Sequence, residues 1–195
     1  MQLKDSKTKE NLLRAFAGES QARNRYDIAA ATAKKEGFNI IESLFKYTAN
    51  QEKEHAEVFF NQLKQSAGEN IEITAAYPID TYATTLDLLK RAQHNEFEEF
   101  NVVYSDFAKV AKEEGFSAIS TIFENIGLIE KVHGTRFERF ANELEQGSLF
   151  KKDTEVQWMC TNCGFIYEGK EAPKNCPVCE HPQGWFLLFN NSLFE

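Results

Sequence analysis

A Glu-x-x-His pattern occurs twice in the chain, as Glu52/His55 and Glu130/His133, with an offset of 78 residues. Both copies interrupt segments whose apolar residues recur at helical spacing, and helical positions three or four apart share one face. A carboxylate and an imidazole therefore lie in the middle of a stripe that must face a core. Because a buried, unpaired carboxylate would take up a proton, such a core has to supply cations. The pattern predicts a helical bundle built around metal.

Two further helical segments place carboxylates on their inward stripes, Glu19 in the first and Glu96 with Glu99 in the third. One Glu from each of two helices plus a Glu-x-x-His pair from each of two others is the ligand set of di-iron and di-manganese carboxylate bundles. Imidazole mixed with oxygen donors suits iron or manganese better than calcium or magnesium. Tyr26 and Tyr104 also fall on these stripes, either as ordinary core aromatics or as partners of the ligands.

The chain has the organisation of two helical hairpins. Each helical segment ends near a glycine, which tolerates the left-handed conformation that closes helices: Gly37, Gly68, Gly115 and Gly147. Residues 69–80 are long enough to return along a helix, so a bundle with one crossover is expected. Most equivalent positions are offset by 78, but Glu19 and Glu96 are offset by 77. The third helix therefore carries one extra residue before Tyr104, which a π-bulge would absorb.

Charge and composition argue against a nucleic-acid-binding, membrane or secreted protein. The net charge of −8 argues against a nucleic-acid surface, which needs clustered Lys and Arg. No apolar run approaches the roughly 20 residues that cross a bilayer, and the polar start of the chain does not resemble a secretion signal. We therefore expect a cytoplasmic protein with neither nucleic-acid nor membrane partners.

The four cysteines lie within 20 residues near the C-terminus, as Cys160-x-x-Cys163 and Cys176-x-x-Cys179. Two such pairs predict one tetrahedral four-sulfur metal site, which would also stabilise a segment too short to bury its own core. Spacing alone does not distinguish a zinc ribbon from an iron centre. We predict a helical bundle in residues 1–147, a linker in 148–155 and the metal-bound module in 156–195.

Three motifs and the cysteine module together resemble rubrerythrin, in the family's order and over nearly the whole chain. The motifs are residues 15–26 (AFAGESQARNRY), 52–56 (EKEHA) and 106–111 (DFAKVA). The resemblance implies an all-α ferritin-like four-helix bundle followed by a small rubredoxin-like β module. One departure is Gly134, where the family often has a larger residue.

By the same resemblance, the bundle would hold two non-haem irons in an oxo- and carboxylate-bridged site, with Glu52 and Glu130 as bridges. The implied ligands are Glu19, Glu52, Glu96, Glu99, Glu130, His133 and, in one redox state, His55. One iron would move between His55 and Glu99, so these two residues are candidate catalytic residues. Tyr26 and Tyr104 are also candidate catalytic residues. A single iron would be bound by Cys160, Cys163, Cys176 and Cys179.

The implied activity is a peroxidase that reduces hydrogen peroxide in oxidative-stress defence. The implied assembly is a homodimer. Electrons would come from a rubredoxin or an NAD(P)H:rubredoxin-type reductase, because the chain has no Gly-rich dinucleotide fingerprint of its own. The main alternative is a ferritin-like ferroxidase, iron-storage or iron-binding protein, which would not need the cysteine module. A zinc-ribbon protein with an inert bundle would leave the buried carboxylates unexplained.

Overall fold

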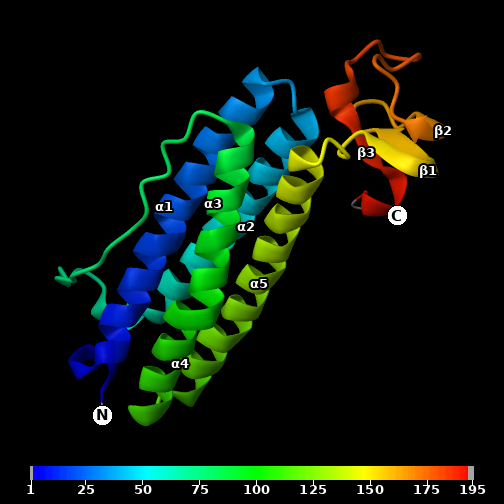
Figure 1. Cartoon of the computed structure of the whole chain (residues 1–195). Coiled ribbons are helices and arrows are strands. Elements are labelled where there is room, and N and C mark those ends of the chain that lie inside the picture. The colour runs from blue at the N-terminus through cyan, green and yellow to red at the C-terminus, as the bar shows by residue number, and fades with distance from the viewer. Residues whose placement is uncertain (1, 193–195) are drawn as a thin grey trace.

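The computed structural model describes residues 2–192; Met1 and residues 193–195, at the ends of the two predicted domains, lie outside the described residues. Two helical hairpins pack into an antiparallel bundle with a small β module at one end (Figure 1). The bundle helices are α1 (Lys7–Lys35), α2 (Asn39–Gln62), α3 (Thr85–Glu98), α4 (Tyr104–Glu113) and α5 (Ser117–Glu145). The predicted bundle is confirmed, and its third long helix consists of α3, a π-helical turn and α4.

The two hairpin turns have the same geometry. Gly37 and Gly115 have φ angles of 83° and 89°, which side chains with a Cβ rarely adopt. In each turn the next residue donates its N–H back across the helix end, from Phe38 to Ala33 O at 2.9 Å and from Phe116 to the matching carbonyl at 2.8 Å. These bonds satisfy carbonyls that a helix terminus leaves free. The turn sequence therefore fixes both hairpins.

Each hairpin turn also caps the first turn of a helix in the other hairpin. Glu114 accepts hydrogen bonds from the N–H groups of Lys7 (3.0 Å) and Thr8 (2.8 Å) and from the Thr8 hydroxyl (2.6 Å). Its counterpart Glu36 accepts one from the N–H of Thr85 at 2.8 Å. Carboxylates stabilise helix N-termini because the free N–H groups point at them. The internal duplication thus has a structural counterpart at both ends of the bundle.

Residues 67–84 form the crossover that returns from the end of α2 to the start of α3, alongside α1 (Figure 1). It is fixed near α3 by Asp80, whose carboxylate is buried. Arg25 donates a hydrogen bond to it, Asn95 donates another at 2.8 Å, and Arg91 forms an ion pair at 3.5 Å. A buried charge needs such partners, so this end of the crossover has a defined position.

The bundle core consists of two apolar clusters, one around Phe45 and Phe137 and the other around Phe59 and Phe123. Along α2 and α5 the Glu-x-x-His pairs fall between these clusters, so the charged layer is enclosed above and below. Arg23, four residues after Glu19 on α1, is exposed. No helix within residues 2–192 is long and apolar enough to cross a membrane.

The C-terminal module is a three-stranded antiparallel sheet in the order β2-β1-β3, with β1 (Lys151–Cys160), β2 (Ile166–Glu171) and β3 (Phe186–Leu188). Trp158 is fully buried and donates to Gly169 O at 2.9 Å. Strand β1 begins inside the predicted linker, because Lys151 pairs with Glu171 across an irregularity in the register. The residues at the start of β1 are polar and have low strand propensity, so the sequence did not predict this pairing.

Candidate metal centre

The predicted π-bulge is present as a π-helical turn, Glu99–Val103, between Glu96 and Tyr104. Aromatic side chains on either side of this turn, Phe97 and Tyr104, pack against α5 at two glycine positions. A Cβ on Gly134 would lie 3.0 Å from the Phe97 ring, and one on Gly127 would lie 3.4 Å from Tyr104 Cβ. Gly134, unexplained by the sequence, is therefore a close-packing position.

The two Glu-x-x-His pairs face each other across the bundle. His55 Nδ1 lies 2.9 Å from Glu52 Oε2 and 3.0 Å from Glu130 Oε1, and His133 Nδ1 lies 3.0 Å from Glu52 Oε1 and 2.9 Å from Glu130 Oε2. Each carboxylate thus presents one oxygen to each histidine. The arrangement has the pseudo-twofold symmetry expected of the duplication.

One further carboxylate lies near each of the two histidines. Glu19 lies on the His55 side and Glu96 on the His133 side, at 4.0 and 3.4 Å from the respective Nδ1 atoms. Two groups of buried side chains therefore have potential ligand atoms within 4.8 Å of one another, and both contain Glu52 and Glu130. They are Glu19, Glu52, His55 and Glu130, and Glu52, Glu96, Glu130 and His133.

Each terminal carboxylate is held by a tyrosine from the other hairpin. Tyr26 donates its hydroxyl to Glu96, and Tyr104 donates to Glu19. Burial raises the pKa of both hydroxyls well above the usual value, and the accepting carboxylates raise it further. The tyrosines therefore stay protonated as hydrogen-bond donors and fix one oxygen of each carboxylate, which leaves the other free to bind.

The remaining polar atoms fit a pair of metal ions. Within residues 2–192, no hydrogen bond reaches either carboxylate oxygen of Glu52 or Glu130, Oε2 of Glu19 or Glu96, or Nδ1 of either histidine. Buried polar atoms are almost always hydrogen-bonded, so a convergent set without such partners is suited to hold cations. Two ions, each facing one histidine and one terminal carboxylate and sharing two bridging carboxylates, would satisfy the whole set.

The electrostatics agree with this reading. Burial, followed by repulsion from neighbouring carboxylates, raises the pKa of Glu19 and Glu130 well above the usual range. Burial also disfavours ionised Glu52, but the imidazoles of His133 and His55, which approach its two oxygens to 3.0 and 2.9 Å, outweigh it and lower its pKa to about 2. Because the cluster has more carboxylates than imidazoles, bound protons are needed to compensate its negative charge. Metal ions would replace these protons.

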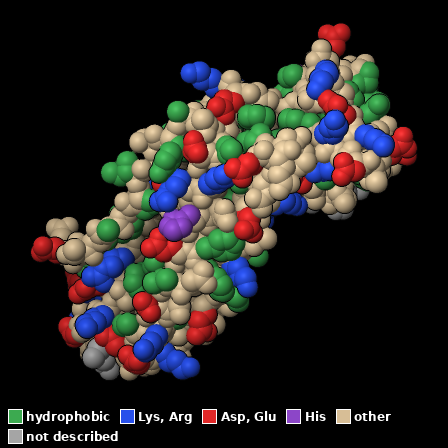
Figure 2. Space-filling view, viewed as in Figure 1, with side chains coloured by type: hydrophobic (Ala, Val, Ile, Leu, Met, Phe, Trp, Pro, Cys, Tyr) green, Lys and Arg blue, Asp and Glu red, His purple; other side chains and the backbone are tan. Residues whose placement is uncertain are grey.

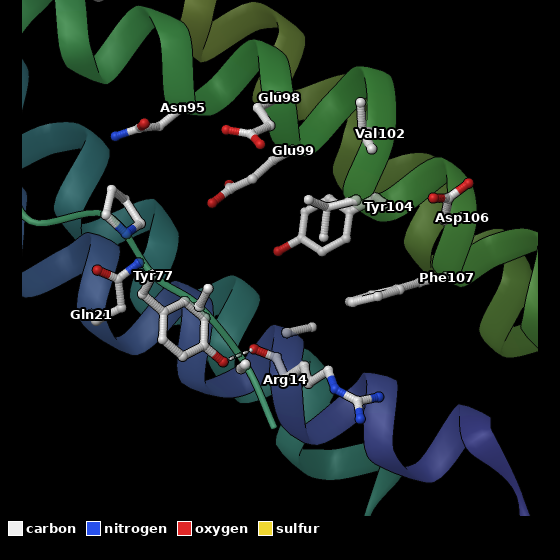
Figure 3. A pocket seen from close by; sticks show the side chains of 16 residues that line it. Arg14, Gln21, Tyr77, Asn95, Glu98, Glu99, Val102, Tyr104, Asp106 and Phe107 are labelled. Carbon is white, nitrogen blue, oxygen red and sulfur yellow. Dashed lines mark hydrogen bonds between the residues drawn. The ribbon is translucent and has the colours of Figure 1, made fainter. Parts of the chain in front are cut away.

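Glu99, the remaining predicted ligand, lies outside both groups. It is half-buried on the π-helical turn and lines a cavity beside the cluster, as Figure 3 shows. Burial, and then the nearby charge of Glu96, raises its pKa well above the usual value. Its carboxyl group can therefore carry a proton next to the site.

Gln51 is a site residue that the sequence did not reveal. Its Oε1 lies 3.0 Å from His133 Nε2, so an N–H on that nitrogen would donate to it and leave Nδ1 free toward the carboxylates. The equivalent position in the other half is Ile129, which is apolar. Because the two halves differ at this position, comparing them did not indicate a role for Gln51.

The four cysteines converge on a second site. All four sulfurs lie within 4.8 Å of one another, and Cys160–Cys179 and Cys163–Cys176 are separated by 3.7 and 3.6 Å. These separations are far longer than a disulfide bond. They fit the edge of about 3.8 Å of a tetrahedron whose metal–sulfur bonds are about 2.3 Å. The sulfurs are therefore arranged for one tetrahedral ion.

The surroundings of the sulfurs favour the ionised form of Cys179 but not that of Cys160. The N–H of His181 lowers the pKa of the Cys179 thiol to about 6, although burial raises that of Cys160 to about 12. The residues after the second cysteine of each pair, Gly164 and Glu180, both adopt positive φ. Such turns direct backbone N–H groups toward sulfur, which tunes the potential of an iron centre.

Comparison with known proteins decides the family. Residues 10–141 match the family described as Rubrerythrin, and residues 158–186 match the family described as Rubrerythrin, rubredoxin-like domain. The chain belongs to the rubrerythrin family. A rubrerythrin from Clostridium perfringens (strain 13 / Type A) is 48% identical over 191 residues, covering 97% of this chain and 98% of that protein. The predicted recognition is confirmed.

Solved structures support the fold of this rubrerythrin-family chain. The fully reduced, all-ferrous state of nigerythrin has a TM-score of 0.63 and 29% identity, over 95% of this chain and 90% of that one. Desulfovibrio desulfuricans bacterioferritin, whose diiron site is described in different catalytic states, has a TM-score of 0.65 and 25% identity, over 73% and 82%. The ferritin-like bundle and rubredoxin-like module are confirmed. The chain thus contains a candidate di-iron site and a four-cysteine site of rubredoxin type.

Proposed function

We propose that the chain is a hydrogen peroxide reductase of oxidative-stress defence in the cytoplasm, in which the cysteine-bound iron relays electrons to the di-iron site. One observation carries the proposal: two metal-ligand groups share Glu52 and Glu130 beside a cavity, in a chain that also contains a four-cysteine site. Family membership supports an iron-dependent oxidoreductase in general. The reaction would be H₂O₂ + 2 e⁻ + 2 H⁺ → 2 H₂O.

The iron pair would supply the two electrons that cleave the O–O bond. The chain's own residues would hold the site and move protons. Tyr26 and Tyr104 keep Glu96 and Glu19 oriented through their hydrogen bonds. Glu99, which lines the cavity and lies near the charge of Glu96, is placed to deliver a proton to a bound peroxide.

We further propose that His55 and Glu99 alternate as ligands of one iron. His55 belongs to a ligand group, whereas Glu99 stands apart on the π-helical turn. Two ferrous ions would be balanced by the carboxylates of Glu19, Glu52, Glu96 and Glu130, which would leave the neutral imidazole of His55 as the natural further ligand. Ferric ions carry more charge and prefer the hard carboxylate oxygen. A π-helical turn inside an α-helix is frequent at functional sites, which supports a functional role for the ligand it carries.

Electrons would enter at the cysteine site from a rubredoxin or an NAD(P)H:rubredoxin-type reductase. Cys163 is exposed and Cys179 half-exposed, so a donor protein can approach the site closely. The module lies at the end of the bundle where α2 begins (Figure 1). The 13 helical residues from there to Glu52 span about 20 Å, which favours a homodimer in which a partner's module shortens the path. We propose residues 1–147 as the catalytic domain, with electron entry in 156–195.

The double variant Cys160→Ser, Cys163→Ser tests this function. Its bundle should fold and its irons should still be oxidised once by hydrogen peroxide, while steady turnover with a rubredoxin-type reductase is lost. A variant of the exposed Lys170, Lys170→Ala, which keeps all four sulfurs, should retain turnover and serves as the control. If the double variant turned over at the wild-type rate, or if oxidised iron accumulated as a mineral core in the wild type, the ferritin-like alternative would be favoured.

A further inference from the structure

A cavity of about 330 Å³ lies between α1, the crossover and the π-helical turn. Figure 3 shows that the side chains of Glu99, Tyr104 and Phe107 project into it from one wall, with Tyr77 on the opposite side. Ala15 and Gly18 of α1 contribute to its floor. The cavity is therefore a partly open pocket, with bundle helices on two sides and the crossover over part of it.

The inner end of this cavity adjoins the metal centre. Tyr104 lines the cavity and donates its hydroxyl to Glu19, a member of the first ligand group. Glu99 lines it as well, and neighbouring Glu96 belongs to the second group. A molecule in the cavity would thus be one side chain away from both ligand groups.

The cavity is much larger than hydrogen peroxide requires. A water molecule takes up about 30 Å³ of liquid volume, and an apolar cavity of about 150 Å³ is large enough to bind benzene. The 330 Å³ observed here would hold a reacting O–O group together with an organic group of several carbons. Side chains such as Ala15, Val103 and Phe107 give such a group apolar walls.

The charges around the cavity favour a neutral molecule. Glu98 and Asp106 contribute carboxylates to its lining. Arg14 also lines it, but its guanidinium is already paired with Glu10 at 2.8 Å. An anion such as a fatty-acid hydroperoxide would be repelled.

Tyr77 forms the cover of the cavity. Its hydroxyl donates to Arg14 O at 2.8 Å, and Arg14 Nε donates to the carbonyl of Thr74 at 3.0 Å, which fixes the crossover to α1. The ring lies directly over Gly18, where an added Cβ would be 3.5 Å from Tyr77 Cε1. Tyr82 belongs to the same crossover but is 45% exposed and does not line the cavity.

We propose that this cavity binds the organic group of small, neutral hydroperoxides, so that the protein reduces these compounds as well as hydrogen peroxide. The inference rests on the proposed function for its electron supply. The reaction is ROOH + 2 e⁻ + 2 H⁺ → ROH + H₂O: the O–O bond breaks, the outer oxygen leaves as water, and the oxygen attached to carbon remains in the alcohol. The two electrons come from the same protein donor that supports hydrogen peroxide reduction.

Binding of the product alcohol tests the cavity without turnover. Calorimetric titration of the iron-loaded protein with 2-phenyl-2-propanol should give saturable binding. Tyr77→Ala should weaken it by up to about tenfold, the scale expected for one aromatic contact, and Tyr82→Ala should leave it within about twofold. Val102→Trp, at a 52% exposed position of the cavity wall, should also weaken binding by filling the space.

Steady-state kinetics with cumene hydroperoxide and hydrogen peroxide provide the second readout. In Val102→Trp the kcat/KM for cumene hydroperoxide should fall about tenfold relative to that for hydrogen peroxide, a change of about 1.4 kcal/mol. Tyr82→Ala should keep the wild-type ratio. A fatty-acid hydroperoxide should be a much poorer substrate than cumene hydroperoxide.

The outcomes separate this inference from the proposed function. Hydrogen peroxide reduction without alcohol binding, or equal binding in Tyr77→Ala, Val102→Trp and Tyr82→Ala, would overturn the inference alone. Rapid reduction of the fatty-acid hydroperoxide would overturn the preference for neutral substrates. If the protein bound the alcohol but reduced neither hydrogen peroxide nor cumene hydroperoxide, the proposed function and the reduction of organic hydroperoxides would both be overturned. The assignment of small, neutral organic molecules as ligands of the cavity would still hold.

Discussion

Glu114 is predicted to stabilise the bundle through the first turn of α1, and the Glu114→Ala variant measures that contribution. Two of its three hydrogen bonds come from Thr8, which is fully buried. Loss of a helix cap costs about 0.5–2 kcal/mol, and a buried donor left without a partner costs about 1–3 kcal/mol. We therefore expect a loss of about 2 kcal/mol. For a chain of this length that lowers Tm by about 4–8 °C at pH 7.

Glu36→Ala is the matched control, because Glu36 occupies the equivalent position but accepts one hydrogen bond rather than three. We expect a loss of about 1 kcal/mol, or about 2–4 °C. Thermal unfolding of both iron-loaded variants, followed by circular dichroism at 222 nm, gives the comparison. Equal Tm values for the two variants, or a wild-type Tm for Glu114→Ala, would refute the capping argument.

The effect of pH on the same variant has a definite sign. Burial disfavours the charged form of Glu114, but hydrogen bonds from Thr8 and Lys7 outweigh it, so its pKa is lowered from 4.5. A carboxylate with a lowered folded-state pKa contributes fully above the unfolded-state pKa and loses its contribution as pH falls through the folded-state value. The Tm difference between wild type and Glu114→Ala should be constant above about pH 5.5 and shrink below pH 4.5. A difference that grew on acidification would contradict the assignment.

Four further substitutions test the metal centre and the packing beside it. Gly134→Ala should destabilise the protein by about 1–2 kcal/mol in denaturant unfolding, because its Cβ would press on Phe97 at 3.0 Å and overpacking outweighs the gain in helix propensity; a stabilised variant would argue against close packing there. Tyr104→Phe should keep the fold but weaken iron retention against a chelator by about tenfold, the scale of a lost partner of a metal ligand, and unchanged retention would exclude that role. Glu99→Ala should bind two ferrous ions but turn over peroxide slowly, whereas His55→Ala should chiefly weaken ferrous binding; the same effect in both would argue against alternating ligands.

The duplication made most of the bundle predictable. Apolar spacing and the glycine turns indicated two hairpins, and the 77-residue offset of Glu19 and Glu96 indicated the π-turn that the structure contains. The predicted ligands other than Glu99 converge in the two groups. Inward stripes predict such convergence because helical periodicity fixes which side chains share a face.

Features outside the periodic pattern were not predictable. The tyrosines were expected near the site, but their cross-hairpin partners depend on how the helices are packed. Gln51 has no counterpart in the second half, and the constraint on Gly134 comes from Phe97 on another helix. Strand β1 extends into residues expected to form a linker because pairing with β2 overrides their weak propensity.

The cysteine module was predictable as a metal site but not as an iron site from spacing alone. Two Cys-x-x-Cys pairs fit zinc and iron equally well, since both accept four thiolates in a tetrahedron. The match of residues 158–186 to the rubredoxin-like family favours iron. Family membership, and not the geometry of the sulfurs, therefore favours iron over zinc.

Iron content, measured together with the absorption spectrum, tests the central claim of a shared di-iron site and a separate cysteine-bound iron. Iron-replete protein purified in air should contain about three irons per chain and show thiolate-to-iron charge-transfer bands that disappear on reduction. Cys160→Ser, Cys163→Ser should lose about one iron and the bands, whereas Glu130→Ala should lose both bundle irons and keep the bands. A colourless wild type with stoichiometric zinc, or a Glu130→Ala variant that retains both bundle irons, would contradict the account.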